Sequence, residues 1–429
     1  MFLTLLKKEC KSIATSLTYY IIIICIVLFY FTNGSEFRML SKPMEGQESY
    51  GYKANDDEDL IMDVTIGKLA LDSYTNSYVA YPFGFYKEVT LNEKKLEQLQ
   101  KIVEELTGLS YEEVTLLVEE YLDNIPMPDT SGMVNYNVMA GVEDIPVSES
   151  INFNRFKVLM EEVDDLIGGG SDYNIKNILS TETVPLTYEE AVIEYENILY
   201  QDKLTGAYAR LFCDYIGIVL GILPIFLAVT RGLRDKRTMV SDVIYSKKIS
   251  STTIILTRYL STIIMILLPV LLISLSPALE SMYYGSSIGI SVDHFAFIKY
   301  IFGWLLPTAM VVTALGFFIT EVTDSALGIL IGGVWWLINM FQSFGNLVGD
   351  FGMNLVPRFN TVGKYTIFKN DFNTLVINRL FYSLLSIILI ICTVYIFSKK
   401  RKGEYNFARK IFSRRKSESD ETTITSSDY

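Results

Sequence analysis

The sequence has little of what enzymes and metalloproteins usually depend on. It contains one histidine, His294, among 429 residues, which excludes most histidine-based metal sites and catalytic triads. Four cysteines are too scattered to form paired zinc ligands or a CxxC motif: Cys10, Cys25, Cys213 and Cys392. Lysine and arginine number 37 against 49 aspartates and glutamates, which argues against a dedicated nucleic-acid binder.

Charge is also missing from long stretches of the chain. A helix needs about 20 apolar residues to cross a bilayer, and six segments meet or approach that length. They are Ile13–Thr32, Leu211–Thr230, Tyr259–Leu279, Tyr300–Thr320, Ser325–Gly349 and Leu380–Ser398. The last four contain no charged residue at all. The pattern predicts an all-α polytopic membrane protein with six transmembrane helices.

The distribution of Lys and Arg predicts the orientation of these spans. With the N-terminus inside, the inner connections and tail hold 19 basic residues, whereas the short outer loops 280–299 and 350–379 hold 5. We therefore expect both termini to be cytoplasmic and residues 34–208 to be extracellular. No small-x-small cleavage pattern follows the first span, so we expect it to be retained.

The expected extracellular domain, residues 34–208, is acidic and mainly helical. It contains 34 acidic and 12 basic residues, which suits either solubility or the attraction of cationic substrates. We expect one helix at Asn154–Ile167. Three capping boxes indicate the starts of others: Thr90-x-x-Glu93, Ser110-x-x-Glu113 and Thr187-x-x-Glu190. A small β element is expected within Tyr81–Val89.

Two other segments indicate interfacial helices. In residues 1–12 the apolar residues Phe2, Leu6 and Cys10 share one helical face and three lysines lie elsewhere. Residues 231–250 carry a helical apolar pattern at Met239, Val240, Val243 and Ile244, with a buried face. This second helix suits either a docked cytoplasmic partner or an anchor to lipid head groups. Three further domains are expected. Residues 1–33 contain the interfacial helix and the first span, and residues 209–398 contain spans two to six. Residues 399–429 form a basic stop-transfer anchor followed by a disordered tail.

The stretches LLKKECKSIATSLTYY and RGLRDKRTMVSDVIYSKKISSTTIILTRYLS resemble the permease subunits of ABC-2-type exporters, especially those of Gram-positive bacteria with a large domain between the first two spans. The resemblance covers about 1–33 and 209–400. It implies a six-span fold in which residues 231–250 form the helix that contacts an ATPase. The ATPase-coupling residues would be Arg231, Arg234, Asp235, Arg237, Ser241, Tyr245 and Ser246.

The resemblance also implies partners and a transport cycle. An ABC nucleotide-binding subunit would bind ATP and Mg²⁺, since this chain has no G-x-x-x-x-G-K-[ST] phosphate loop, and a second permease, identical or different, would complete the path. The exported substrate would be a peptide, a lipid or a drug-like molecule. Residues 350–379 would either dip back into the membrane or form a surface lid. We assign no catalytic residue, metal site or cofactor to this chain itself.

Two features inside the spans complete the prediction. Gly328, Gly332 and Gly333 allow close helix approach in span five, or reflect the ordinary glycine content of membrane helices. Asp214 follows Arg210 by one helical turn, and we expect an ion pair at the outer end of span two in preference to a proton or substrate role. An alternative function is a membrane-anchored receptor or sensor that acts through its extracellular domain.

Overall fold

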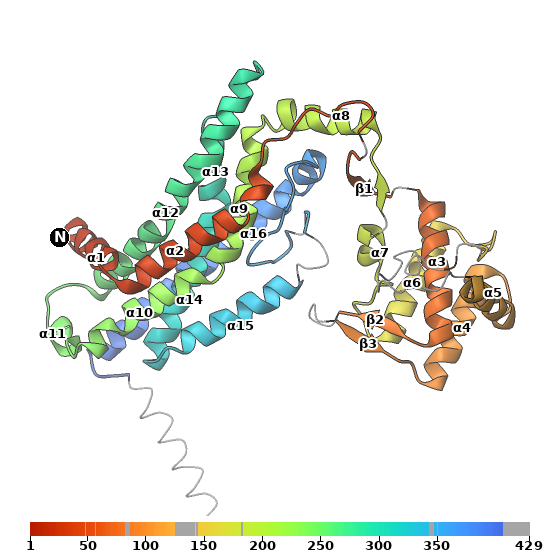
Figure 1. Ribbon diagram of the computed structural model, residues 1–429. Helices are drawn as coiled ribbons and strands as arrows, with labels where there is room; N and C mark the ends of the chain where they lie inside the picture. The colour runs from red at the N-terminus through yellow and green to blue at the C-terminus, as the bar shows by residue number, and fades with distance from the viewer. Residues whose placement is uncertain are drawn as a thin grey trace, which may run out of the picture. The chain divides into compact units, whose positions relative to one another are not determined.

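A computed structural model describes residues 1–47, 49–55, 57–81, 86–124, 142, 145–181, 183–342, 347–349 and 351–405. These residues are mostly helical, and their strands are short (Figure 1). The chain divides into two compact units, described here one at a time. Unit 1 comprises Met1–Lys42, Ile193–Met340 and Leu347–Tyr429, and unit 2 comprises Pro43–Val192 and Phe341–Asn346. Unit 2 is thus narrower than the expected domain 34–208, because residues 34–42 and 193–208 pack with unit 1.

Unit 2 consists of helices with two small antiparallel ribbons. One ribbon pairs β1 with β4 and the other pairs β2 with β3. Strand β3 confirms extended structure in the last part of 81–89, of which residues 82–85 lie outside the described residues. The elements are β1 (Tyr52–Ala54), α3 (Glu58–Thr75), β2 (Tyr78–Ala80), β3 (Lys87–Val89), α4 (Glu93–Thr107), α5 (Tyr111–Asn124), α6 (Phe153–Ile167), α7 (Ile175–Thr181), β4 (Thr183–Pro185) and α8 (Tyr188–Glu196), whose last residues belong to unit 1.

The core of unit 2 lies between α3, α4 and α6. It buries Leu99, Val103 and Leu106, which recur at helical spacing along α4, against residues such as Leu69 and Phe156. Burial of side chains of this size contributes about 1.5–3 kcal/mol each.

Helix ends in unit 2 follow side-chain capping. The boxes at Ser110 and Thr187 are confirmed: the Glu113 carboxylate accepts from the Ser110 backbone, and the Glu190 carboxylate accepts from the Thr187 backbone. The box at Thr90 is wrong. Helix α4 starts later, because the Asn92 side chain accepts from the Lys95 N–H and acts as its N-cap. The helix expected at Asn154–Ile167 is confirmed as α6, and Gly168 ends it with a φ of 120°.

Unit 1 is a bundle of long helices. In it α14 packs against α10 and α16, and α1 lies against α12 (Figure 1). The elements are α1 (Phe2–Ala14), α2 (Leu17–Thr32), η1 (Gly34–Phe37), η4 (Asn197–Gln201), α9 (Thr205–Leu220), α10 (Leu223–Arg237), α11 (Ser241–Tyr245), α12 (Ser251–Ser287), α13 (Ala296–Tyr300), η5 (Ile301–Leu305), α14 (Leu306–Thr323), α15 (Leu327–Gln342) and α16 (Tyr365–Arg401).

Several helices of unit 1 are apolar and long enough to cross a membrane. By length and composition, three described segments qualify: Ser251–Ser287, Ala296–Thr323 and Tyr365–Arg401. The number rises to five if the bent pairs α1/α2 and α9/α10 each form one span. Helix α15 has 16 residues, about 24 Å of helix, which is less than the expected span Ser325–Gly349 and less than a hydrocarbon core of about 30 Å. The membrane character agrees with the sequence, whereas the number of six spans stays a prediction.

Two bends divide apolar segments of unit 1. Helices α1 and α2 meet at 69°, so residues 2–14 form a helix of their own, as the amphipathic pattern predicted. Helices α9 and α10 meet at 40°, between Leu220 and Leu223. Pro224 lies in the first turn of α10, where a missing N–H costs nothing. The second expected span is therefore a broken helix that starts at Thr205 and continues to Arg237.

The Asp72 carboxylate of unit 2 is largely buried, which disfavours its charged form. The Tyr173 hydroxyl donates to Asp72 Oδ2 at 2.6 Å, and Lys68 is paired with the neighbouring Asp172 at 2.6 Å. Burial raises the pKa of Asp72 to about 6, although Tyr173 and Lys68 act in the opposite direction. A raised pKa means that the folded state binds the proton more tightly than the unfolded chain does.

We expect unit 2 to lose stability as the pH rises from about 4 to about 7, by about 3 kcal/mol from Asp72 alone. The contribution is fully present below the unfolded pKa near 3.8 and is lost as the pH passes the folded pKa. Asp72→Asn removes this pH dependence, since the amide still accepts from Tyr173. Pulse proteolysis of the full chain in detergent, following fragments of unit 2 at several pH values, measures it. An unchanged pH profile in Asp72→Asn would contradict the assignment, and Asp63→Asn serves as the exposed control on the same helix.

Candidate functional site

The predicted coupling segment 231–250 consists of three parts. Arg231, Arg234, Asp235 and Arg237 lie on the last two turns of α10. Helix α11 follows with only five residues, Ser241–Tyr245, and a loop then leads into α12. Of these four residues, Arg231 is buried, Asp235 is half-buried, and Arg234 and Arg237 are exposed. The segment is therefore an extension of a long helix, and its charged residues face different neighbours.

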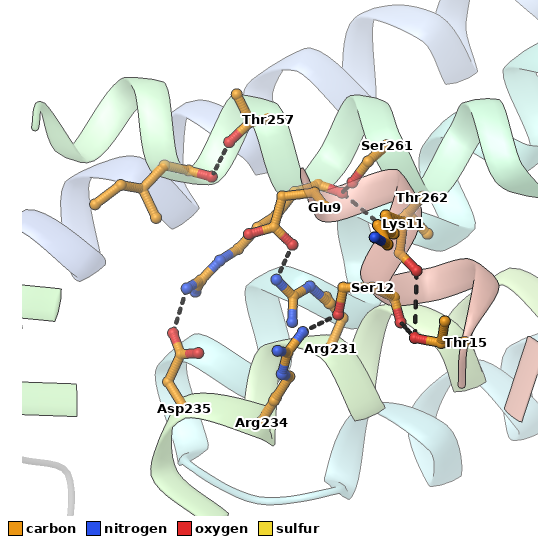
Figure 2. A network of polar contacts seen from close by, with 12 residues as sticks. Glu9, Lys11, Ser12, Thr15, Arg231, Arg234, Asp235, Thr257, Ser261 and Thr262 are labelled. Atoms are coloured by element: carbon orange, nitrogen blue, oxygen red, sulfur yellow. Dashed lines mark hydrogen bonds and ion pairs between the residues drawn. The ribbon is translucent and has the colours of Figure 1, made fainter. Parts of the chain in front are cut away.

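Arg231 and Arg234 connect α10 to the N-terminal helix α1. The Arg231 guanidinium forms an ion pair with Glu9, and both side chains are at least 90% buried. One turn further along α10, Arg234 donates to the Ser12 hydroxyl (Figure 2). Two contacts spaced by one turn on each helix fix the relative rotation of α1 and α10.

Asp235 connects α10 to the start of α12. It accepts from Arg258, whose side chain is 6% exposed (Figure 2). Arg258 also lies one helical turn before Thr262, whose hydroxyl donates to the Arg258 carbonyl oxygen. The charges of α10 therefore reach α1 through Arg231 and α12 through Asp235.

A third ion pair joins α14 to α16. Lys400 Nζ lies 3.6 Å from Glu321 at the end of α14 and 2.7 Å from Asp324 in the connection to α15. The side chains of Lys400 and Glu321 are 7% and 12% exposed. We refer to Glu9, Arg231, Asp235, Arg258, Glu321 and Lys400 together as the charged cluster.

The charged cluster is electrically balanced, with three carboxylates and three cations. Breaking one partner of a buried ion pair costs several kcal/mol, because the remaining charge stays in a medium of low polarity. The ion pairs therefore resist separation of α10 from α1 and α12, and of α14 from α16.

Helix α11 corrects the expectation of a buried face in the segment 231–250. Met239 is 91% exposed and Val243 is 56% exposed, and Val240 is exposed as well. Within α11, Ile244 and Tyr245 pack against the core of unit 1, as does Ile249 after it, and the centroid of the Tyr245 ring lies 5.6 Å from that of Phe397. A helix of five residues has too few turns to present separate apolar and polar faces, so most of the apolar pattern faces outward.

The other predicted coupling residues have local roles. Ser241 starts α11, and the Ser246 hydroxyl donates to the Val243 carbonyl oxygen at the end of that helix. Burial raises the pKa of Tyr245 to about 12, so this ring stays neutral. Arg237 is exposed at the end of α10.

Two of the three predicted glycine contacts occur. A Cβ on Gly332 would lie 2.2 Å from Ile225 of α10, and one on Gly328 would lie 3.1 Å from Val229 of the same helix. A Cβ on Gly333 would meet nothing within 4 Å, so its role in close approach is not supported. Gly316 of α14, which the sequence analysis did not single out, also lies close to α10. A Cβ on Gly316 would lie 2.8 Å from the Ala228 Cβ.

The predicted ion pair between Arg210 and Asp214 is wrong, because each residue has another partner. Arg210 pairs with Asp202, which lies just before α9, and it also donates to the backbone carbonyl oxygen of Val362 at 2.7 Å. Its guanidinium lies over the Phe359 ring, 4.6 Å from the centroid. Asp214 accepts from Arg358 Nε at 2.9 Å and from the Phe359 N–H at 2.6 Å.

These pairs hold the segment before α16 inside unit 1. Phe351, Leu355, Val356 and Phe359 are at most 1% exposed. Within 350–379, this part is an inserted segment of the bundle, which excludes a loose surface lid for these residues. Arg210 and Asp214, one helical turn apart on α9, therefore both hold this segment in place, Arg210 through the Val362 carbonyl oxygen and Asp214 through Arg358.

Sequence analysis did not single out four of the six residues of the charged cluster: Glu9, Arg258, Glu321 and Lys400. Glu9 gave a detectable signal. It lies four residues after Leu5 and four before Ile13, so a carboxylate interrupts an apolar helical stripe. Its partner was not detectable, because nothing in the sequence places Arg231 opposite α1.

No group of three or more His, Cys, Asp and Glu side chains suited to a metal ion occurs in the described part of the chain. Comparisons with protein-family models, with curated proteins and with solved structures give no match for this chain.

We expect the Glu9–Arg231 pair to behave as one unit. Glu9→Gln or Arg231→Met alone leaves a buried charge and lowers the free energy of unfolding by about 3 kcal/mol. The double variant Glu9→Leu with Arg231→Met recovers most of this loss. Chemical denaturation of the purified chain in detergent measures all three, with Lys8→Gln as the exposed neighbour that leaves stability unchanged. A double variant as unstable as the sum of the singles would show that the two residues are independent.

Proposed function

We propose that this chain is the permease subunit of an ATP-binding-cassette exporter. A separate nucleotide-binding subunit would hydrolyse ATP and bind at α11, and this chain would convert that event into movement of its helices. The exported substrate would be a peptide, a lipid or a drug-like molecule. The proposal rests on one observation: an exposed apolar surface, Met239, Val240 and Val243, lies beside the charged cluster, whose buried ion pairs join α10 to α1 and α12, and α14 to α16.

The surface at α11 has the chemistry of a protein contact. Three apolar side chains are exposed together, next to the exposed cations Lys236, Arg237, Lys247 and Lys248. Hydrophobic anchors surrounded by a charged rim are the usual composition of a protein interface. An anchor to lipid head groups combines apolar side chains and cations as well, and recovery of a nucleotide-binding subunit decides between the two.

The charged cluster explains how a push at α11 would act at a distance. Arg231 and Asp235 are on the helix that leads directly into α11, and their partners lie on α1 and α12. A displacement of α10 would therefore also move α1 and α12. Close packing at Gly316, Gly328 and Gly332 would carry the same displacement into α14 and α15.

The membrane arrangement in this proposal is the one derived from the sequence. Helix α1 would lie at the inner membrane surface, and α2, α9/α10, α12, α13/α14, α15 and α16 would be the six spans. Both termini would be cytoplasmic and unit 2 would be extracellular in a bacterial cell membrane. A second permease, identical or different, would complete the transport path.

The acidity of unit 2 favours cationic substrates within this proposal, through a negative field that attracts positive ligands. The competing function, a membrane-anchored receptor or sensor, also uses unit 2 but gives no role to the exposed α11 surface.

Affinity purification from membranes of the native host tests the proposal. We expect a nucleotide-binding ATPase to co-purify with the tagged chain in mild detergent and to hydrolyse ATP. Met239→Asp with Val243→Asp should reduce its recovery at least tenfold, because two charges enter an apolar contact and both positions are exposed in the free chain.

Leu116→Asp is the matched control, since Leu116 is 64% exposed on α5 of unit 2 and its substitution leaves recovery unchanged. Absence of any such ATPase, or equal recovery with the double variant, would refute the proposal.

A further inference from the structure

The last turn of α16 makes contacts that a simple stop-transfer anchor does not need. The sequence Lys399-Lys400-Arg401-Lys402 was expected to be a stop-transfer anchor. Instead, Lys400 is buried in its ion pair with Glu321, and Arg401 is half-buried against the loop between α11 and α12.

Arg401 uses its whole guanidinium on the backbone of that loop. Nε donates to the Tyr245 carbonyl oxygen at 2.8 Å, and the two terminal nitrogens donate to the carbonyl oxygens of Lys247 and Ile249. A planar fork with five N–H groups can satisfy three acceptors at once, whereas a lysine ammonium cannot reproduce this geometry.

The loop has few other bonds to hold it. The backbone N–H groups of Ser246, Lys247 and Ile249 donate locally, to the carbonyl oxygens of Asp242, Ile244 and Lys247. The Tyr245 ring also contacts the Phe397 ring of α16. Arg401 therefore provides the long-range polar contacts that fix the direction in which α11 leaves α10.

The same turn also fixes the neighbouring connection. Lys400 donates to Asp324 at 2.7 Å, and the Tyr405 hydroxyl donates to the Val322 carbonyl oxygen at 3.2 Å. Two connections, α11–α12 and α14–α15, thus converge on one helical turn.

We infer that Arg401 is a positioning residue for the α11 surface and that the end of α16 orients the contact with the nucleotide-binding subunit. The effect on the nucleotide-binding subunit rests on the proposed function, whereas the positioning of the loop by Arg401 does not. Loss of the guanidinium frees residues 245–249, and the exposed Met239 and Val243 then lose their fixed orientation toward a partner.

Limited trypsin digestion of the full purified chain tests the positioning, because Lys247 and Lys248 are exposed cleavage sites in the loop. We expect Arg401→Gln to accelerate cleavage there at least tenfold, measured relative to cleavage at Lys101 in unit 2. The ratio separates loop release from general unfolding, which raises both rates. Lys402→Gln removes an exposed charge next to it and should leave the ratio unchanged.

Arg401→Lys tests whether the planar guanidinium or the positive charge alone positions the loop. We expect it to cleave nearly as fast as Arg401→Gln, since lysine keeps the charge and loses the fork. Full protection in Arg401→Lys, or an unchanged ratio in Arg401→Gln, would overturn the inference.

Recovery of the ATPase supplies the second readout. We expect at least a fivefold loss with Arg401→Gln and none with Lys402→Gln. Faster cleavage with undiminished recovery would overturn the orienting role. If wild-type chain recovers no ATPase, the proposed function fails, and the cleavage ratio still decides the positioning of the loop.

Discussion

The cost of burying a guanidinium in an apolar bundle governs this structure. Arg231 lies 8% exposed among the helices of unit 1, and the Glu9 carboxylate forms an ion pair with it. That requirement ties a separate N-terminal helix to the end of α10. The same constraint recurs at Arg258 with Asp235 and at Lys400 with Glu321, so the helices meet at this end in one arrangement.

A second pair of buried arginines governs the opposite end of α9 and α10. Arg210 with Asp202, and Arg358 with Asp214, hold an irregular segment within the bundle, and Phe351, Leu355 and Phe359 fill the space around it. Unit 1 thus has ionic anchors at both ends of a helix that is bent in the middle by 40°. Between them the contacts are apolar side chains and glycines, which permit small rotations. In the proposed exporter, ATP-driven movement at α11 would be carried along this bent helix between two rigid ends.

Local features of the fold were predictable, and long-range pairings were not. Charge-free runs predicted α12, α14 and α16, and the capping boxes at Ser110 and Thr187 predicted where two helices begin. These predictions succeeded because each signal lies within one short segment of sequence. The Arg210–Asp214 prediction failed for the opposite reason. A spacing of four residues suggests a pair, but Arg358 and Asp202 compete from other elements, and only the folded chain brings them close. Arg401 shows the same limit, since its acceptors are backbone carbonyl oxygens, which no sequence pattern records.

The central claim is that α11 faces the cytoplasm and unit 2 faces the outside. Labelling of single cysteines in intact cells with a membrane-impermeant maleimide tests it directly, after Cys10, Cys25, Cys213 and Cys392 are replaced by serine or alanine. Leu116→Cys should react in intact cells, and Met239→Cys should react only after the membrane is permeabilised. Reaction of Met239→Cys in intact cells would place the α11 surface outside, where no ATPase could bind it, and would contradict the account.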